Sequence, residues 1–125
     1  MKINPKKCVE DLMQDALIFE SCNKLIFIAE NNGIDIVYEK YIPDHAIYLY
    51  EDRTITIKTS LNKNERDFAI AYCLGRILFC DDVYEFCFDG NKDYDKIDSG
   101  KNAHGFGVEF ANEFLKVEWL NELWF

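Results

Sequence analysis

The sequence predicts a single α+β domain, in which a small antiparallel sheet of about three strands packs against an N-terminal helix, a central buried helix and a C-terminal helix. Two observations predict this class. Several stretches have the apolar spacing of helices, and one run alternates apolar and polar residues as a half-buried strand does. With 125 residues, 49% of them hydrophobic, the chain 1–125 is long enough to bury one core.

The stretch from Asn64 to Cys80 predicts the central helix. Its apolar residues fall on two neighbouring helical faces, one of them with the spacing i, i+3, i+7, i+10 and i+11 that begins at Phe68. A helix that is apolar on two faces is covered from two sides, so we expect the other elements to pack around it. Asn62 and Asn64 are both competent caps for its first turn.

The N-terminal third predicts helical structure that ends at a glycine. Asn4 and Pro5 offer a cap and a first-turn proline, and apolar residues then follow at amphipathic spacing from Val9 to Leu17. The pattern resumes at Leu25, and Gly33 is a natural C-terminal stop. Whether one helix continues through residues 21–23 stays open.

Three runs predict the strands of the sheet, and the last of them alternates isoleucine with threonine and lysine: Ile34–Tyr38, Ala46–Tyr50 and Thr54–Thr59. The rest of the chain holds a short aromatic-rich segment, one long polar and glycine-rich loop, and a segment with helical spacing: Val83–Phe88, Asp89–Gly107 and Val108–Phe125.

Charge and composition narrow the classes of partner. The net charge of -9 repels nucleic-acid phosphate and anionic lipid, so we expect neither direct nucleic-acid binding nor a membrane, and a basic protein surface is the natural counterpart. No apolar run is long enough to cross a bilayer or to serve as a secretory signal, which predicts a cytoplasmic protein. Five irregularly spaced cysteines then indicate reduced thiols.

Four stretches have an order and spacing in common with a known family: Gly33–Ile36 followed by Ile42-Pro43, the hairpin that ends in Thr54–Ile57, the segment Phe68–Arg76, and Phe110–Phe114. Taken together, over a span from about Asn23 to Leu120, they resemble the ImmA/IrrE family of small zinc metallopeptidase domains. In that family the central helix carries Phe-x-x-Ala-His-Glu-x-Gly-His, whose two histidines bind zinc while the glutamate acts as general base.

The resemblance implies that the catalytic residues have been replaced. Tyr72, Cys73 and Arg76 stand where the family has histidine, glutamate and histidine. Arg76 decides this interpretation, because its fixed positive charge cannot ligate a cation. We therefore expect no catalytic residue, no metal and no cofactor.

The family's third zinc ligand is a glutamate just ahead of an Ala-Asn or Ala-Asp pair, and Glu109 is the nearest candidate, although Val108 occupies the usual register. A carboxylate near Arg76 suggests that a guanidinium–carboxylate pair bridges the two helices where the metal would lie. The alternative is that Arg76 extends to solvent along the cleft.

Other chemistry has weaker support in the sequence. Cys73, Cys80, Cys87 and His104 are zinc-binding residue types, but they lack the close pairing of structural zinc sites, and buried core thiols are the simpler interpretation. A divergent hydrolase that uses Cys73 or His104 is therefore an alternative. His45 has no catalytic partner nearby in sequence.

The last seven residues include the aromatic residues Trp119, Trp124 and Phe125, which indicate either core packing or an interface, including a homo-oligomer. The resemblance implies a non-catalytic pseudo-metallopeptidase that acts by binding a protein. Because active relatives act on helix-turn-helix repressors, the expected partner is a DNA-binding regulator or a defence protein, and the expected setting is a phage or mobile element. The acidic surface fits such a basic partner.

Overall fold

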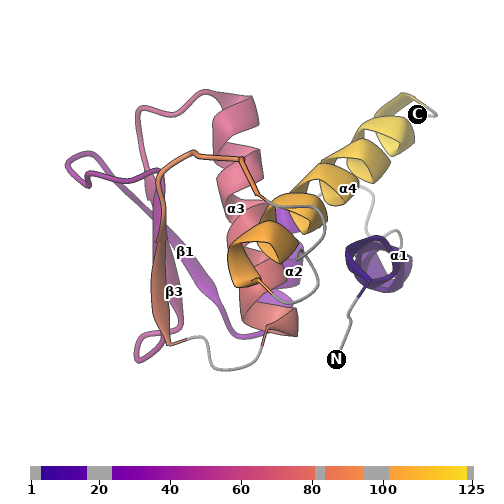
Figure 1. Cartoon of the computed structure of the whole chain (residues 1–125), viewed down its shortest axis with the longest axis horizontal. Helices are drawn as coiled ribbons and strands as arrows, with labels where there is room; N and C mark the ends of the chain where they lie inside the picture. The colour runs from indigo at the N-terminus through magenta and orange to yellow at the C-terminus, as the bar shows by residue number, and fades with distance from the viewer. Residues whose placement is uncertain (1–3, 17–23, 81–83, 95–101, 124–125) are drawn as a thin grey trace.

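The computed structural model describes residues 4–16, 24–80, 84–94 and 102–123, with side chains except those of residues 12–16 and 117–123. The helices lie on one side of a small sheet, which confirms the predicted α+β class (Figure 1). The elements follow one another in the order α1 (Pro5–Ala16), α2 (Lys24–Asn31), β1 (Asp35–Glu39), β2 (Ala46–Leu49), β3 (Thr54–Lys58), α3 (Lys63–Phe79), β4 (Glu85–Phe88) and α4 (Ala103–Leu123).

The sheet is mixed and four-stranded, with the order β1-β3-β2-β4. The prediction of about three antiparallel strands was wrong on two points. The segment Glu85–Phe88 forms a fourth strand antiparallel to β2, and β1 pairs with β3 in parallel. The reason for the parallel pair is topological: each turn reverses the chain, so the first and third strands share a direction, and the hairpin places β3 between β1 and β2.

The two faces of the sheet differ in burial. Ile55 and Ile57 of β3 are fully buried, and Ala46, Tyr48 and Phe88 extend the same buried face across β2 and β4. The opposite face carries the alternating residues of each strand, and the described helices leave it uncovered (Figure 1).

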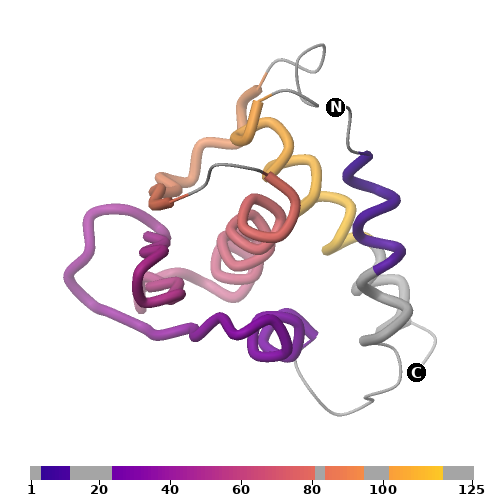
Figure 2. The backbone as a smooth tube through the Cα atoms, turned by 90° about the horizontal axis from the view of Figure 1, so that it is seen from below, coloured from indigo at the N-terminus to yellow at the C-terminus, as the bar shows by residue number. Residues whose placement is uncertain are grey.

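Helix α3 lies at the centre of the molecule, with the sheet on one side and the other helices around the rest (Figure 2). Asn62 caps it: its side chain accepts the backbone N–H of Glu65 at 2.8 Å, and the Glu65 carboxylate accepts the backbone N–H of Asn62 at 3.1 Å. This capping box fixes the start that the sequence had left between Asn62 and Asn64. Every residue from Asp67 to Gly75 is buried, which confirms the predicted central buried helix.

Helix α4 begins at Ala103, five residues before the predicted start at Val108, so the end of the expected long loop is helical. Asn102 supplies the cap, because its side chain accepts the backbone N–H of His104 at 2.8 Å and of Gly105 at 3.3 Å. The glycine at 107 permits close packing: a Cβ there would lie 2.8 Å from the ring of Tyr72. The glycines that indicated a loop instead let two helices approach.

Helix α2 ends as the sequence predicts. Gly33 has φ +71°, and the backbone N–H of Ile34 bonds to the carbonyl of Ala29 at 2.9 Å, as in a Schellman motif. Arg53 donates to the carbonyls of Asn32 and Gly33 and so caps the same helix end from the β2–β3 turn. Residues 17–23, on which the continuity of the N-terminal helices depends, lie outside the described part.

Within the described residues, no helix combines the length and the apolar character that a bilayer crossing requires.

Candidate functional site

Two of the three residues that align with the family's motif, Tyr72 and Arg76 on α3, form a hydrogen-bonded chain with the first turn of α4. Arg76 Nη1 donates to the hydroxyl of Tyr72 at 2.8 Å, and that hydroxyl lies 2.9 Å from Nδ1 of His104. His104 Nε2 lies 3.0 Å from the backbone carbonyl of Asp93. Because arginine only donates and a carbonyl only accepts, the chain is complete when the Tyr72 hydroxyl donates to Nδ1 and the imidazole carries its proton on Nε2.

The position of the chain follows from helical geometry. Tyr72 and Arg76 are four residues apart and therefore lie on one face of α3. The ring of Tyr72 stacks on Phe88 of β4 with centroids 4.3 Å apart. Burial raises the pKa of the Tyr72 phenol in spite of the neighbouring Arg76 guanidinium, so the hydroxyl stays protonated at neutral pH.

The guanidinium of Arg76 lies over an aromatic ring of the sheet. Its central carbon is 4.0 Å from the ring centroid of Phe86 and 5.6 Å from that of Tyr72. Its Nε is buried and has no hydrogen-bond acceptor among the residues that the structure describes. A permanent cation therefore occupies the position that the family resemblance assigns to a zinc ligand.

Cys73 faces the core and not the site. Its side chain is fully buried, and burial raises the pKa of its thiol far above the ordinary value. A protonated, enclosed thiol is neither a nucleophile nor a metal ligand. The arrangement supports the interpretation of Cys73 as a core residue.

The expected pair of Arg76 with Glu109 does not form. Glu109 instead accepts a hydrogen bond of 2.9 Å from the hydroxyl of Tyr94. The reason lies in the register of α4. Gly107 faces Arg76, because a Cβ added to Gly107 would lie 3.0 Å from Arg76 Cγ. Glu109 is two residues further along, so its side chain points about 200° away around the helix. Arg76 does not simply extend to solvent either, because it is stacked and hydrogen-bonded.

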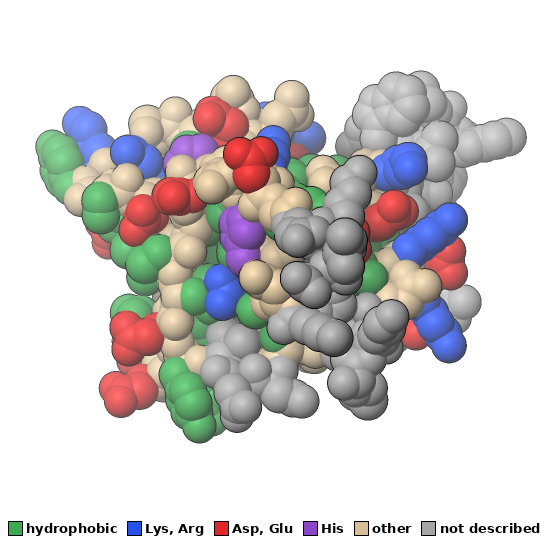
Figure 3. Space-filling model, in the orientation of Figure 1, with side chains coloured by type: hydrophobic (Ala, Val, Ile, Leu, Met, Phe, Trp, Pro, Cys, Tyr) green, Lys and Arg blue, Asp and Glu red, His purple; other side chains and the backbone are tan. Residues whose placement is uncertain are grey.

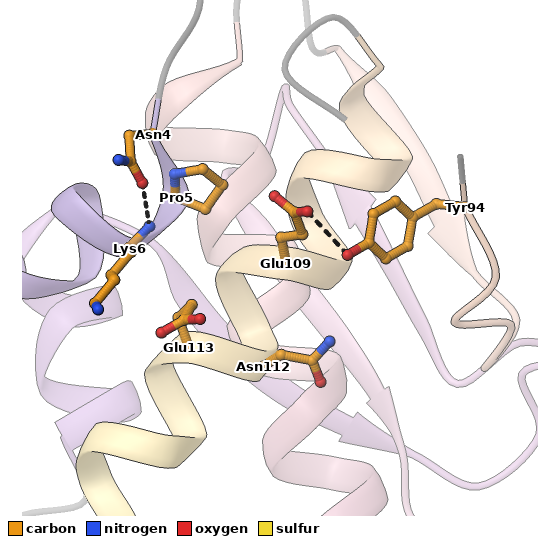
Figure 4. A pocket seen from close by; sticks show the side chains of 7 residues that line it. All are labelled: Asn4, Pro5, Lys6, Tyr94, Glu109, Asn112 and Glu113. Carbon is orange, nitrogen blue, oxygen red and sulfur yellow. Dashed lines mark hydrogen bonds between the residues drawn. The ribbon is translucent and has the colours of Figure 1, made fainter. Parts of the chain in front are cut away.

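Glu109 lines a separate cavity of about 330 Å³ between the start of α1 and α4 (Figure 4). The close-up shows Tyr94 on one side of Glu109, and Glu113 one turn further along α4 on the side of Lys6. Burial, followed by the hydrogen bond to Glu109, raises the pKa of Tyr94 to about 12. This cavity is therefore polar and carries two carboxylates.

A second cavity, of about 400 Å³, lies at the end of the sheet where β2 turns into β3 and β4 begins. Tyr50 and Tyr84 form an edge-to-face pair there, with centroids 5.5 Å apart, and are 49% and 66% exposed. Its remaining lining is Leu49 and three acidic residues, Glu51, Asp52 and Glu85. We call these six residues the acidic–aromatic cleft. In Figure 3, acidic and hydrophobic side chains adjoin along the side where the sheet lies.

The carboxylates of the cleft have no cationic partner in the described part of the chain. The ion pairs among the described residues, with nitrogen and oxygen within 4.0 Å, join Lys63 and Arg66 to Asp67 near the start of α3. Three acidic side chains beside two exposed aromatic rings can therefore pair with a cationic group of another molecule.

The cysteines and histidines of the hypothetical Cys/His site are dispersed. Cys73 is buried, Cys80 is half-buried and Cys87 is exposed on the uncovered face of the sheet. In the ranges that the structure describes, no three His, Cys, Asp or Glu side chains are grouped so as to hold a metal ion. His45 packs edge-to-face on Phe88 with centroids 5.9 Å apart.

The predicted C-terminal interface cannot be placed. Trp119 lies in the backbone of α4 but its side chain is outside the described set, and Trp124 and Phe125 lie beyond the described residues.

Sequence reasoning missed the partners that complete the site. The sequence placed His104 in a loop and Phe86 in a short aromatic-rich segment with no assigned strand, whereas His104 contacts Tyr72 and Phe86 contacts Arg76. The Asn102 cap was the available signal for the earlier start of α4. Tyr50 and Tyr84 carry no sequence signal of their pairing, because it depends on the register of β2 with β4.

Comparisons of the chain with protein-family models, curated proteins and solved structures found no match.

Proposed function

We propose that this protein is a non-catalytic binding module, a pseudo-metallopeptidase that acts by binding a basic, DNA-binding protein. The first support is the chemistry of α3. Tyr72 is a protonated phenol, Cys73 an enclosed thiol and Arg76 a stacked cation, and none of these groups binds zinc or activates water as the family's residues do. The alternative of a Cys73 hydrolase gains no support, because the thiol is fully buried.

The observation that carries the binding role is the acidic–aromatic cleft. Exposed tyrosines with nearby carboxylates recognise Lys and Arg side chains, because the ring faces attract the cation and the carboxylates pair with it. A surface that exposes two paired aromatic rings beside uncompensated charge has the composition of a recognition site.

The class of partner follows from charge complementarity. A DNA-binding protein presents a basic surface, and a chain of net charge -9 is attracted to that surface over long range. By occupying it, the module competes with DNA. This mode of action fits a regulator or inhibitor of a repressor or defence protein encoded on a phage or mobile element, as the family resemblance implies.

Charge reversal in the cleft tests the proposal. The module is used as bait in the native host, and the recovered protein is purified and titrated against wild type and against the double variant Glu51→Lys/Glu85→Lys. We expect a DNA-binding partner whose affinity falls about tenfold or more in the double variant and whose DNA displaces the module.

The matched control is Glu10→Lys/Glu30→Lys, which changes the net charge equally at two exposed positions on α1 and α2. The control should bind within about twofold of wild type at fixed salt. Equal weakening by both double variants would show that net charge acts without the cleft. A partner that binds independently of DNA and of all four substitutions would overturn the proposed function.

A further inference from the structure

Arg76 is a half-buried cation, and none of the described carboxylates lies within 4.0 Å of its guanidinium. The groups that do contact it are neutral: the Tyr72 phenol and the rings of Tyr72 and Phe86. A partly desolvated charge that stays unpaired is costly, so an external group of opposite charge would be bound favourably beside it.

Most N–H groups of the guanidinium also have no acceptor among the described residues. Its five N–H groups have one acceptor among the described residues, the Tyr72 hydroxyl at 2.8 Å from Nη1. The Nε–H is buried and has no acceptor in this part of the chain. The Tyr72 hydroxyl accepts from Nη1 and its own proton is engaged with His104.

The contacts around Arg76 hold the guanidinium in place. Its central carbon lies over the ring of Phe86, 4.0 Å from the ring centroid, and the bond of 2.8 Å to the Tyr72 hydroxyl fixes the direction of Nη1. Helix α4 closes against the aliphatic stem at Gly107. The N–H groups therefore project in fixed directions along the guanidinium edges, as a fork that matches the two oxygens of a planar anion.

We propose that Arg76 is the anchor of a binding site for a carboxylate. The two oxygens of the carboxylate face N–H groups of the guanidinium that Tyr72 does not occupy. The site is independent of the acidic–aromatic cleft, and it accepts a charge of the opposite sign. A carboxylate suits it better than a phosphate dianion, because one cation among neutral groups balances a single charge, and the net charge of -9 opposes a polyanion.

The test is a titration of the folded protein with sodium acetate at constant ionic strength, with chloride as the balancing anion. The readout is the Nε–H resonance of Arg76 in a nitrogen–proton NMR spectrum, with the Nε–H of Arg66 as an internal control on the same helix. We expect a saturable shift at Arg76, with a Kd of about 1–100 mM for one charge-assisted pair. Arg66, which lies beside Asp67, should not show it.

The matched variants are Arg76→Lys and Arg66→Lys, which both keep the charge. Arg76→Lys should raise the Kd for acetate about tenfold, since a lysine lacks the fork and the stacking plane, whereas Arg66→Lys should change it less than twofold. The wild-type titration decides the proposal even if Arg76→Lys fails to fold. A linear, unsaturated shift, or an equal response to chloride, would overturn the site. Phosphate that binds as tightly as acetate would overturn the assignment to carboxylates.

Discussion

At the scale of single residues, two glycines set how closely α3 and α4 pack. A Cβ on Gly75 would lie 2.6 Å from Cγ of Phe110, and Phe110 is fully buried. A Cβ on Gly107 would meet the ring of Tyr72 and the stem of Arg76. The same contacts that exclude a methyl group bring His104 to Tyr72, so the packing of the helices and the geometry of the site have one cause.

Gly75→Ala tests this packing. Alanine favours a helix over glycine by about 1 kcal/mol, but the methyl group would overlap an enclosed ring, and overpacking costs about 1–3 kcal/mol or more. We expect a net decrease in the free energy of unfolding, measured by urea denaturation.

The double variant Gly75→Ala/Phe110→Ala is the control, because alanine lacks the Cγ and Cδ1 atoms that make the two shortest contacts. It should be more stable than the sum of the two single changes implies. Strict additivity, or a stabilised Gly75→Ala, would contradict the close contact.

At the scale of elements, the sequence predicted what depends on neighbours in the chain. The alternation at Ile55 and Ile57 predicted β3, and Gly33 predicted the end of α2, because both signals are local. The four-residue strand β4 and the parallel pairing of β1 depend on register with distant residues, which no local pattern shows.

The candidate site divides in the same way. The contact between Tyr72 and Arg76 follows from a spacing of four residues on a predicted helix, and it lies where the motif placed it. The contact with His104 required the true start of α4, and two nearby glycines had indicated a loop instead. The pair of Arg76 with Glu109 was wrong because a shift of two residues on a helix reverses the direction of a side chain.

The cap of α3 provides a prediction at this scale. Asn62→Ala removes the acceptor for the backbone N–H of Glu65 and breaks the reciprocal bond, which should lower the free energy of unfolding by about 0.5–2 kcal/mol. Asn64→Ala, at an exposed position within the first turn, should change it by less than about 0.5 kcal/mol. Thermal or urea unfolding measures both. Equal effects of the two substitutions would argue that the capping box does not set the start of the helix.

At the scale of the whole molecule, some charged side chains of opposite sign lie apart without pairing in the described part of the chain. Among the described residues, the carboxylates of the acidic–aromatic cleft have no cationic partner and Arg76 has no carboxylate partner. Both proposals start from these two groups of unpaired charge, which are of opposite sign and lie apart. The two proposals therefore fail or succeed separately: reversing charge at the cleft leaves the Arg76 fork intact, and Arg76→Lys leaves the cleft intact.

The buried phenols make the stability of the folded protein fall at alkaline pH. Burial raises the pKa of Tyr48 and Tyr72, and burial together with Glu109 raises that of Tyr94 to about 12. The unfolded chain releases these protons near pH of about 10. Between that pH and about 12 the folded state holds more protons than the unfolded state, so the free energy of unfolding decreases as pH rises, whereas below about 10 the contribution is fully present.

Urea unfolding at a series of pH values from about 8 to 12 measures the decrease. Tyr94→Phe removes one group with a raised pKa, so its stability should depend less steeply on pH than that of wild type above pH of about 10. Tyr41→Phe, which removes a phenol from a side chain that is 88% exposed, is the matched control and should follow the wild-type profile. If the profiles of wild type and Tyr94→Phe coincide, the link between Tyr94 and Glu109 does not contribute to the alkaline loss of stability, and the cavity between α1 and α4 is open to water at Tyr94.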